Sequence, residues 1–209
     1  MTRLLFVLGA LELVALTSVA GQRVRLRVDG IALTYQEVAG GRDAVGAGGG
    51  GGLEISLGRF RLDGRIHSAR VAPDSSHLAS YDFTQVDVRI DYLLTPVFAL
   101  EVGGGRRYVR PEFSAQGVGY TRIGIFSENR LHRLASVWVR GAFLPGPRFS
   151  GGGTAELAFE FSLGAGVGTA NGRFRFHAEF EFQRIDREAG GADVPIQQSL
   201  ARTGIAIGF

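Results

Sequence analysis

Cysteine and lysine are both missing from this chain of 209 residues, because all 23 of its basic residues are arginine. Without cysteine there are no disulfide frameworks, thiolate metal sites or cysteine nucleophiles. Without lysine an ordinary P-loop lacks its phosphate-binding side chain. Proline is scarce at 6 residues, whereas glycine reaches 32 and phenylalanine dominates the aromatic residues at 15. The composition thus excludes thiol-based and P-loop chemistry.

The chain also lacks a large excess of charge of one sign. Its formal net charge is +3, and arginine alternates with aspartate and glutamate along the sequence. Nucleic-acid binding requires a one-signed basic patch. We therefore expect no nucleic-acid partner.

Long apolar runs are restricted to the N-terminus. Arg3 precedes an apolar run over residues 4–19, and Ser18-Val19-Ala20 places small residues at the positions that a signal peptidase inspects. Glu12 interrupts the run, which is short for a transmembrane anchor. We predict a signal peptide over residues 1–20 and a mature domain over residues 21–209.

Later segments fall short of the ~18 apolar residues that a membrane helix needs. A mature chain that crosses a membrane must then do so as a closed barrel, because lipid cannot satisfy an open strand edge.

Apolar residues instead recur at every second position. In the most regular segment, residues 173–183, Phe174, Phe176, Phe180 and Phe182 alternate with charged and amide side chains. A two-residue period predicts β-strands with one apolar and one polar face. Segments of this kind number about ten, with eight as the alternative. A soluble lipocalin-like barrel or β-sandwich would show the same period with its apolar face inward.

The expected connections alternate in length. Short turns are predicted at Gly58-Arg59, Leu94–Pro96, Glu128–Leu131 and Thr169–Gly172, and long loops at Val38–Gly49, Ala72–Tyr81, Arg110–Gln116, Pro145–Gly152 and Asp186–Pro195. Outer-membrane barrels have short periplasmic turns and long external loops. Aromatic residues also flank both ends as two interfacial girdles would: Phe60, Tyr92, Phe98, Phe174 and Phe209 on the turn side, and Tyr35, Tyr108, Phe143 and Phe182 on the loop side.

The last segment, residues 197–209, places Thr203, Ile205, Ile207 and Phe209 on one face. It resembles the terminal strand of bacterial outer-membrane β-barrels, which alternates and ends on phenylalanine. The resemblance implies that Ile205, Ile207 and Phe209 form a signal read by the barrel assembly machinery. It also implies an outer-membrane location and contact with outer-membrane lipid.

Together these features predict an all-β protein, a closed antiparallel up-and-down transmembrane β-barrel. The resemblance to the OmpA transmembrane domain and to OmpX-like barrels covers nearly all of the mature chain. One irregularity is a change of phase at Asp29-Gly30, which suits a bulge or a hairpin turn; we favour the bulge because it keeps the strand count even.

A barrel this small encloses little more than side-chain volume. Charges buried there persist only when they are paired. We therefore expect a largely plugged lumen filled by an ion-pair network of Arg61, Arg65, Asp87, Arg89, Asp91, Glu101, Arg107, Arg122, Arg140, Glu156, Glu160, Arg173, Arg175, Glu179 and Glu181. Trp138, on the same face, is expected to pack as part of the plug.

The leading functional hypothesis is a structural or interaction barrel whose external loops bind a ligand that the sequence does not identify. A passive small-solute channel is the alternative. A third possibility is a rim-located protease or lipid-modifying enzyme, since Asp74, Ser75, Ser76, His77 and Asp82 share one predicted loop region. No two histidines have metal-ligand spacing, and we expect no cofactor, metal or catalytic site.

Overall fold

The computed structural model describes residues 22–37, 42–74, 79–110 and 117–209. The predicted signal peptide and its cleavage point after Ala20 lie outside the described residues. No described segment forms a helix long and apolar enough to cross a membrane.

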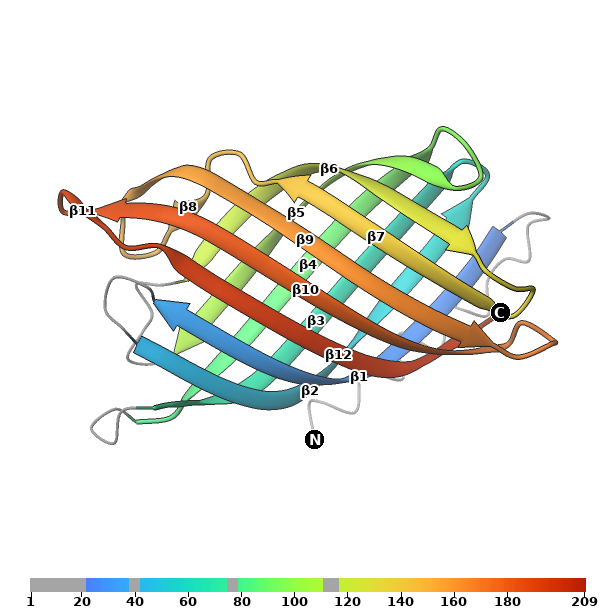
Figure 1. Ribbon diagram of the computed structural model, residues 1–209, viewed down its shortest axis with the longest axis horizontal. Coiled ribbons are helices and arrows are strands. Elements are labelled where there is room, and N and C mark those ends of the chain that lie inside the picture. Colours follow the sequence, from blue (N-terminus) through green and yellow to red (C-terminus); the bar gives the residue numbers. More distant parts are fainter. Residues whose placement is uncertain (1–21, 38–41, 75–78, 111–116) are drawn as a thin grey trace.

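Ten long antiparallel strands form the wall of a closed barrel (Figure 1). They are β1 (Gln22–Glu37), β2 (Arg42–Leu57), β3 (Phe60–Pro73), β4 (Tyr81–Leu93), β5 (Phe98–Arg110), β6 (Val118–Arg130), β7 (Ala135–Phe143), β9 (Thr154–Gly168), β10 (Phe174–Ala189) and β12 (Ile196–Gly208). Two short strands, β8 (Arg148–Phe149) and β11 (Ala192–Asp193), lie in the connections at the opposite end from the short turns. The predicted fold class and strand number are confirmed.

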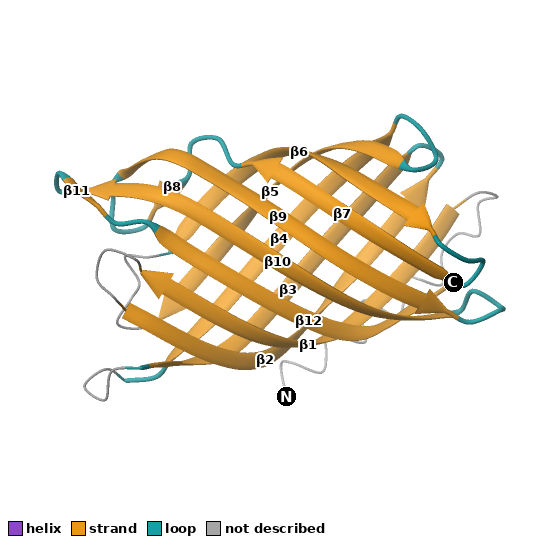
Figure 2. Cartoon of the chain, in the orientation of Figure 1, coloured by secondary structure: helices purple, strands orange, loops and turns teal. Residues whose placement is uncertain are grey.

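The barrel closes where the first strand meets the last. β1 pairs with β12 from Arg25↔Gly208 to Glu37↔Ile196, and β9 pairs with both β7 and β10. Every other wall strand pairs with its neighbours in sequence (Figure 2). Each wall strand thus has a hydrogen-bonded neighbour on both sides, and the sheet closes on itself.

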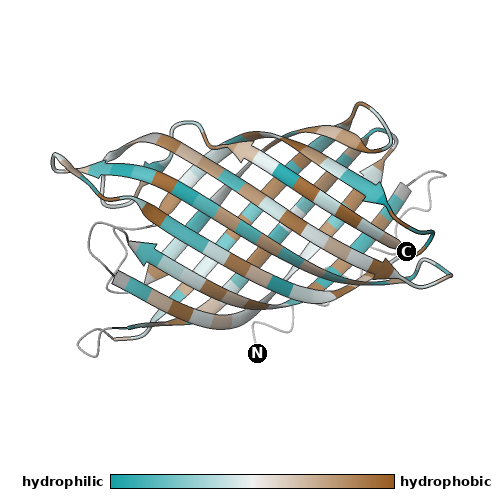
Figure 3. Cartoon of the chain, in the orientation of Figure 1, coloured by the Kyte–Doolittle hydropathy of each residue, from teal (hydrophilic) through white to brown (hydrophobic). Residues whose placement is uncertain are grey.

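The two ends of the barrel differ. The turn end carries the short connections β2–β3, β4–β5, β6–β7 and β9–β10, and the loop end carries the other connections, including β8 and β11. Figure 3 shows apolar residues, in brown, interspersed with polar ones along the strands. The exposed fractions place the apolar residues on the outer wall. Val28 is 71% exposed, Phe176 56% and Leu163 54% on this surface. The apolar face of these strands therefore points away from the barrel axis.

The glycine-rich stretch was predicted to be a loop up to Gly49, and this prediction was wrong. Residues 42–49 belong to β2, which pairs along its length with β1 and β3. A Cβ on Gly48 or Gly50 would collide with the β3 backbone, and one on Gly50 also with the ring of His67. Glycine is needed here because β3 and its lumen side chains approach β2 closely.

The expected bulge at Asp29-Gly30 is also absent. The register of β1 with both neighbours runs through this pair without a shift. Odd-numbered residues therefore face the lumen throughout β1. The apparent change of phase arises because these lumen residues change from arginine and aspartate to Ile31, Leu33 and Tyr35. Tyr35 is accordingly buried in the lumen and is not part of an outer aromatic girdle.

Candidate functional site: the lumen and its turn-side mouth

The middle of the lumen is crossed by a buried ion-pair network. Arg89 on β4 reaches Glu160 on β9 at 3.0 Å and Glu181 on β10 at 3.1 Å. Glu160 also binds Arg122, and Glu181 also binds Arg202. These bonds join strands from opposite parts of the wall, so the side chains fill the cross-section of the barrel.

Further ion pairs extend the network toward the turn end. Arg65 lies 2.8 Å from Asp63 and 2.9 Å from Glu179. Arg61 donates to Asp91 at 2.8 Å, while Arg140 binds Glu101. The network includes the following residues of the predicted set: Arg61, Arg65, Asp87, Arg89, Asp91, Glu101, Arg122, Arg140, Glu160, Arg175, Glu179 and Glu181.

Three residues of the predicted set stand apart. Arg107 is buried but donates to the amide oxygen of Gln183, with its guanidinium carbon 5.8 Å from the centre of the Phe83 ring. Arg173 was expected in the lumen, yet it is exposed in the turn before β10. The alternating sequence pattern extends to one residue before the first residue of this strand, so it included Arg173. Glu156 lies on β9, and its side chain is outside what the structure describes.

Several network members were absent from the predicted set. Arg27 binds Asp63, and Arg202 binds Glu181. Asp29 accepts a contact of 2.6 Å from His177 and lies 3.6 Å from His67. All of these share the parity of the charged face of their strands, so the alternation alone would have identified them. For Asp29 the supposed phase change at Asp29-Gly30 hid this signal.

Glu128 shows a different error, because it was predicted in a turn. It instead lies on β6, where its carboxylate pairs with Arg175 at 2.8 Å and lies 3.7 Å from Arg61. Ser136 also donates to it at 2.8 Å. The strand continues to Arg130, which places Glu128 in the turn-side mouth of the lumen.

Toward the loop end, the lumen changes from charged to apolar. A contiguous buried cluster closes the barrel there, with Val71, Ile185 and Leu200 all at 0% exposure. The apolar layer consists of Ile31, Leu33, Tyr35, Ala44, Ala69, Val71, Tyr81, Phe83, Val109, Val118, Tyr120, Ala142, Leu144, Phe149, Ala158, Ile185, Ile196 and Leu200. The expectation of a charged plug thus describes only part of the lumen, which is closed by two successive layers.

The outer wall around the apolar layer is mixed, because polar pairs stand beside exposed apolar residues such as Val45 and Phe143. Ser68 and Thr84 face outward and share a 2.8 Å hydrogen bond, and the exposed Arg70 pairs with Asp82 at 2.9 Å. Arg184 pairs with Asp186 on the outward face of β10. The loop end of the barrel therefore has an apolar interior, and its outer wall carries polar pairs that the other described parts of the wall lack.

Trp138 packs into the turn-side half of the lumen. Its indole nitrogen donates to Glu179 at 3.1 Å, and the Arg175 guanidinium lies 4.9 Å from its ring centre. Gly164 on β9 leaves the space that the indole occupies, since a Cβ there would collide with the ring. Trp138 is thus part of the plug in the structure.

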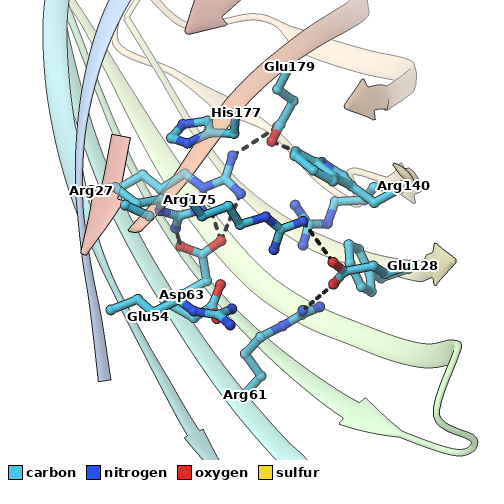
Figure 4. Close-up of a pocket in the computed structure, with 14 residues that line it drawn as sticks. Arg27, Glu54, Arg61, Asp63, Glu128, Arg140, Arg175, His177 and Glu179 are labelled. Atoms are coloured by element: carbon cyan, nitrogen blue, oxygen red, sulfur yellow. Dashed lines mark hydrogen bonds and ion pairs between the residues drawn. The ribbon is translucent and has the colours of Figure 1, made fainter. Parts of the chain in front are cut away.

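Below this plug, the turn-side mouth narrows into a small inner cavity of about 40 Å³. Figure 4 shows Arg27, Arg61, Arg140 and Arg175 extending into it, with Glu128 bridging two of these arginines. The cavity opens into a wider vestibule that is bounded by the short turns. Among the described residues, no group of three or more histidine, aspartate or glutamate side chains is arranged to hold a metal ion.

Comparison with known proteins gives a fold but no family. No protein-family model matches the chain, and no curated protein matches its sequence. Among solved structures, the outer membrane protease OmpT from Escherichia coli is similar with a TM-score of 0.53 at 10% identity, over 92% of this chain and 98% of that chain. The fold is that of an outer-membrane β-barrel.

Two further barrels are similar at lower scores. Neisserial surface protein A has a TM-score of 0.45 at 8% identity, covering 88% of this chain and 96% of its own. Ail, the attachment invasion locus protein of Yersinia pestis, has a TM-score of 0.43 at 10% identity. The match covers 90% of this chain and 98% of Ail.

Proposed function

We propose that this protein is a bacterial outer-membrane β-barrel that crosses the membrane with a closed lumen and serves a structural or interaction role. It belongs, on this proposal, with the small barrels typified by the OmpA transmembrane domain and OmpX. Residues 1–20 direct export, and the long connections at the loop end form the external binding surface.

The observation that supports this function best is the double closure of the lumen. A solute moving along the axis would first have to break the ion pairs of Arg89, whose side chain is 0% exposed. Removing one partner of a buried ion pair costs about 3–5 kcal/mol. The solute would then have to displace the apolar layer around Leu200 and Val71. These two barriers argue against the alternative of a passive channel.

The apolar outer wall supports the membrane location. Soluble monomers rarely expose apolar patches beyond a few hundred Å². Here exposed leucine, isoleucine, valine and phenylalanine residues occur on all the wall strands. Ile205, Ile207 and Phe209 belong to this surface, with Phe209 65% exposed, which suits recognition of the last strand by the assembly machinery.

The proposal includes no catalytic step. The predicted loop group contains Asp74 and Asp82 within the described residues, whereas Ser75, Ser76 and His77 lie outside them. Asp82 is paired with Arg70. The likeness to a protease is a likeness of fold at 10% identity.

Planar-bilayer conductance measured on purified protein tests the closed lumen. Heat-modifiable migration on a detergent gel and sedimentation with the outer membrane first establish that the barrel is folded and correctly located. We expect no conductance steps above the lipid background, while an open porin reconstituted in parallel conducts. Regular, salt-dependent steps would contradict the closed lumen. Recovery of monodisperse protein in detergent-free buffer would contradict the membrane location.

A further inference from the structure

The turn-side vestibule concentrates positive charge that is dispersed in the sequence. Its lining includes two glutamates, Glu54 and Glu128, against a larger group of arginines. These are Arg23, Arg25, Arg61, Arg130, Arg133, Arg173 and Arg175. Since the whole chain carries a net charge of only +3, the mouth is far more positive than the rest of the molecule.

Much of this charge is not neutralised within the barrel. Arg25 is paired with Glu54 at 2.9 Å, and Arg175 with Glu128. Within the described part of the chain, Arg23, Arg130, Arg133 and Arg173 take part in no ion pair. A concave site lined by one sign of charge attracts counter-ions and raises their local concentration.

The inner cavity at the vestibule floor offers hydrogen-bond donors without partners. Arg140 lines this cavity and is 2% exposed, and its buried Nη1 group has no hydrogen-bond partner. The Nε group of Arg27 is likewise buried and unpartnered. A volume of about 40 Å³ would hold roughly three water molecules or one small charged group. The cavity is lined by six arginines and four carboxylate residues, and it therefore combines space, an excess of arginine and guanidinium donors without partners.

Glu128 already shows how an anion would be held there. Its carboxylate lies between Arg61 and Arg175 (Figure 4). It also accepts a hydrogen bond from Ser136. Guanidinium groups bind carboxylate and phosphate oxygens in the same manner. A mobile oxyanion that entered the cavity would compete with Glu128 for these arginines.

We propose that the turn-side mouth binds a small, multiply charged oxyanion of the phosphate class, with one anionic group in the inner cavity near Arg140 and Arg175. The vestibule arginines attract the ligand from the periplasmic side. The Arg89 layer above the cavity stops it from passing farther, so the mouth is a binding site and not the entrance of a pore.

Isothermal titration of the folded barrel with pyrophosphate, in zwitterionic detergent at about 0.1 M salt, tests this site. We expect saturable binding of one pyrophosphate per barrel. Arg175→Gln should weaken it about tenfold or more, because a charge-assisted hydrogen bond is lost. Arg173→Gln, which removes an exposed arginine outside the ion-pair network, should weaken it by a smaller factor. Glu128→Gln should tighten it, because the internal competitor is removed.

Arg148→Gln is the matched control, since Arg148 is an exposed arginine in β8 at the loop end. It should leave pyrophosphate affinity unchanged. Absence of saturable binding to the folded wild-type barrel, or equal weakening by Arg148→Gln and Arg173→Gln, would overturn the proposal. So would weaker binding in Glu128→Gln.

A second arm adds a short-chain anionic phospholipid to the micelles. Displacement of pyrophosphate by this lipid supports the site and identifies a lipid headgroup as the source of the oxyanion. Undiminished binding supports a free solute. The conductance experiment has a separate readout, so the closed lumen and the oxyanion site can fail independently.

Discussion

Arg89 joins parts of the wall that are distant in sequence. Its two carboxylate partners, Glu160 and Glu181, are 71 and 92 residues away along the chain. All three side chains are fully or almost fully buried. A buried charge without its partner is costly, so each member of this group depends on the others.

Replacement of Arg89 by alanine should therefore destabilise the barrel strongly. Glu160 and Glu181 would lose a shared counter-charge, and we expect the free energy of unfolding to fall by about 3–5 kcal/mol. Urea unfolding of the barrel in detergent micelles, followed by loss of heat-modifiable migration, measures the change.

Arg70→Gln provides the comparison for Arg89→Ala. Arg70 also pairs with an aspartate, but its side chain is 62% exposed and that of Asp82 is 72% exposed. An exposed pair contributes at most about 1 kcal/mol. If the two substitutions destabilised the barrel equally, burial would not be what makes the Arg89 pairs important.

At the scale of single strands, β2 depends on glycine at its inward-facing positions. Gly46, Gly48, Gly50 and Gly52 alternate along β2, and a Cβ on each would lie too close to the backbone of β3. At these four positions the strand has no side chain on the lumen side. The space that it leaves is used by His67 and its neighbours.

Gly48→Ala is expected to impair folding of the barrel, because the added methyl group would meet the carbonyl oxygen of Ser68 and the backbone can relieve the contact only by moving β2 from β3. Overpacking of this kind typically costs about 1–3 kcal/mol. The fraction of heat-modifiable protein after refolding and the urea midpoint both measure it. Gly64→Ala on β3 should be tolerated, since a Cβ there has no atom within 4 Å. Equal behaviour of the two variants would show that the close approach of β2 and β3 is unimportant.

Most wall strands could be predicted because their side chains record the two faces. Phe174 to Phe182 and Phe60 to Ile66 alternate without interruption, and the structure places them as this period requires. The two-residue period does not reveal the first half of β2, because glycine has no side chain that would mark the apolar or the polar face. It also misleads at Asp29-Gly30, because the lumen itself changes from charged to apolar there and resembles a change of phase.

The turn-side mouth could not be predicted for a related reason. Its arginines come from β1, β3, β6, β10 and two turns, and each stands beside residues of other types in the sequence. Only closure of the barrel brings them to one end. An alternating linear pattern therefore conceals a strongly charged site.

For the molecule as a whole, the polar pairs on the outer wall of the loop end bear on where the border of the proposed membrane-spanning region lies. Apolar outward residues such as Val28 surround the charged half, while the outward residues near the loop end include the polar pairs of Arg70 and Arg184. A polar outer wall with an apolar interior is stable in water. On the proposed outer-membrane location, the loop end projects beyond the lipid.

Cysteine scanning can locate this border, because the native chain has no cysteine. In intact membranes, Gln36→Cys at the loop end of β1 should react with a charged maleimide, whereas Val28→Cys should not, since lipid would cover it. Both should react after denaturation in detergent. Labelling is read as a mass shift. Reaction of Val28→Cys in intact membranes would place the border elsewhere.

The pairing of β1 with β12 constrains the order in which the barrel can fold. Arg25 on β1 pairs with Gly208 on β12, so β1 gains its second neighbouring strand only when the C-terminal strand is available. Almost the entire polypeptide must therefore be present before the barrel can close. Contacts between such remote segments slow folding. Until then, β1 has an unpaired backbone edge that can pair with strands of other chains. A chaperone that shields β1 during transit would thus meet a need that arises from the closure of the barrel.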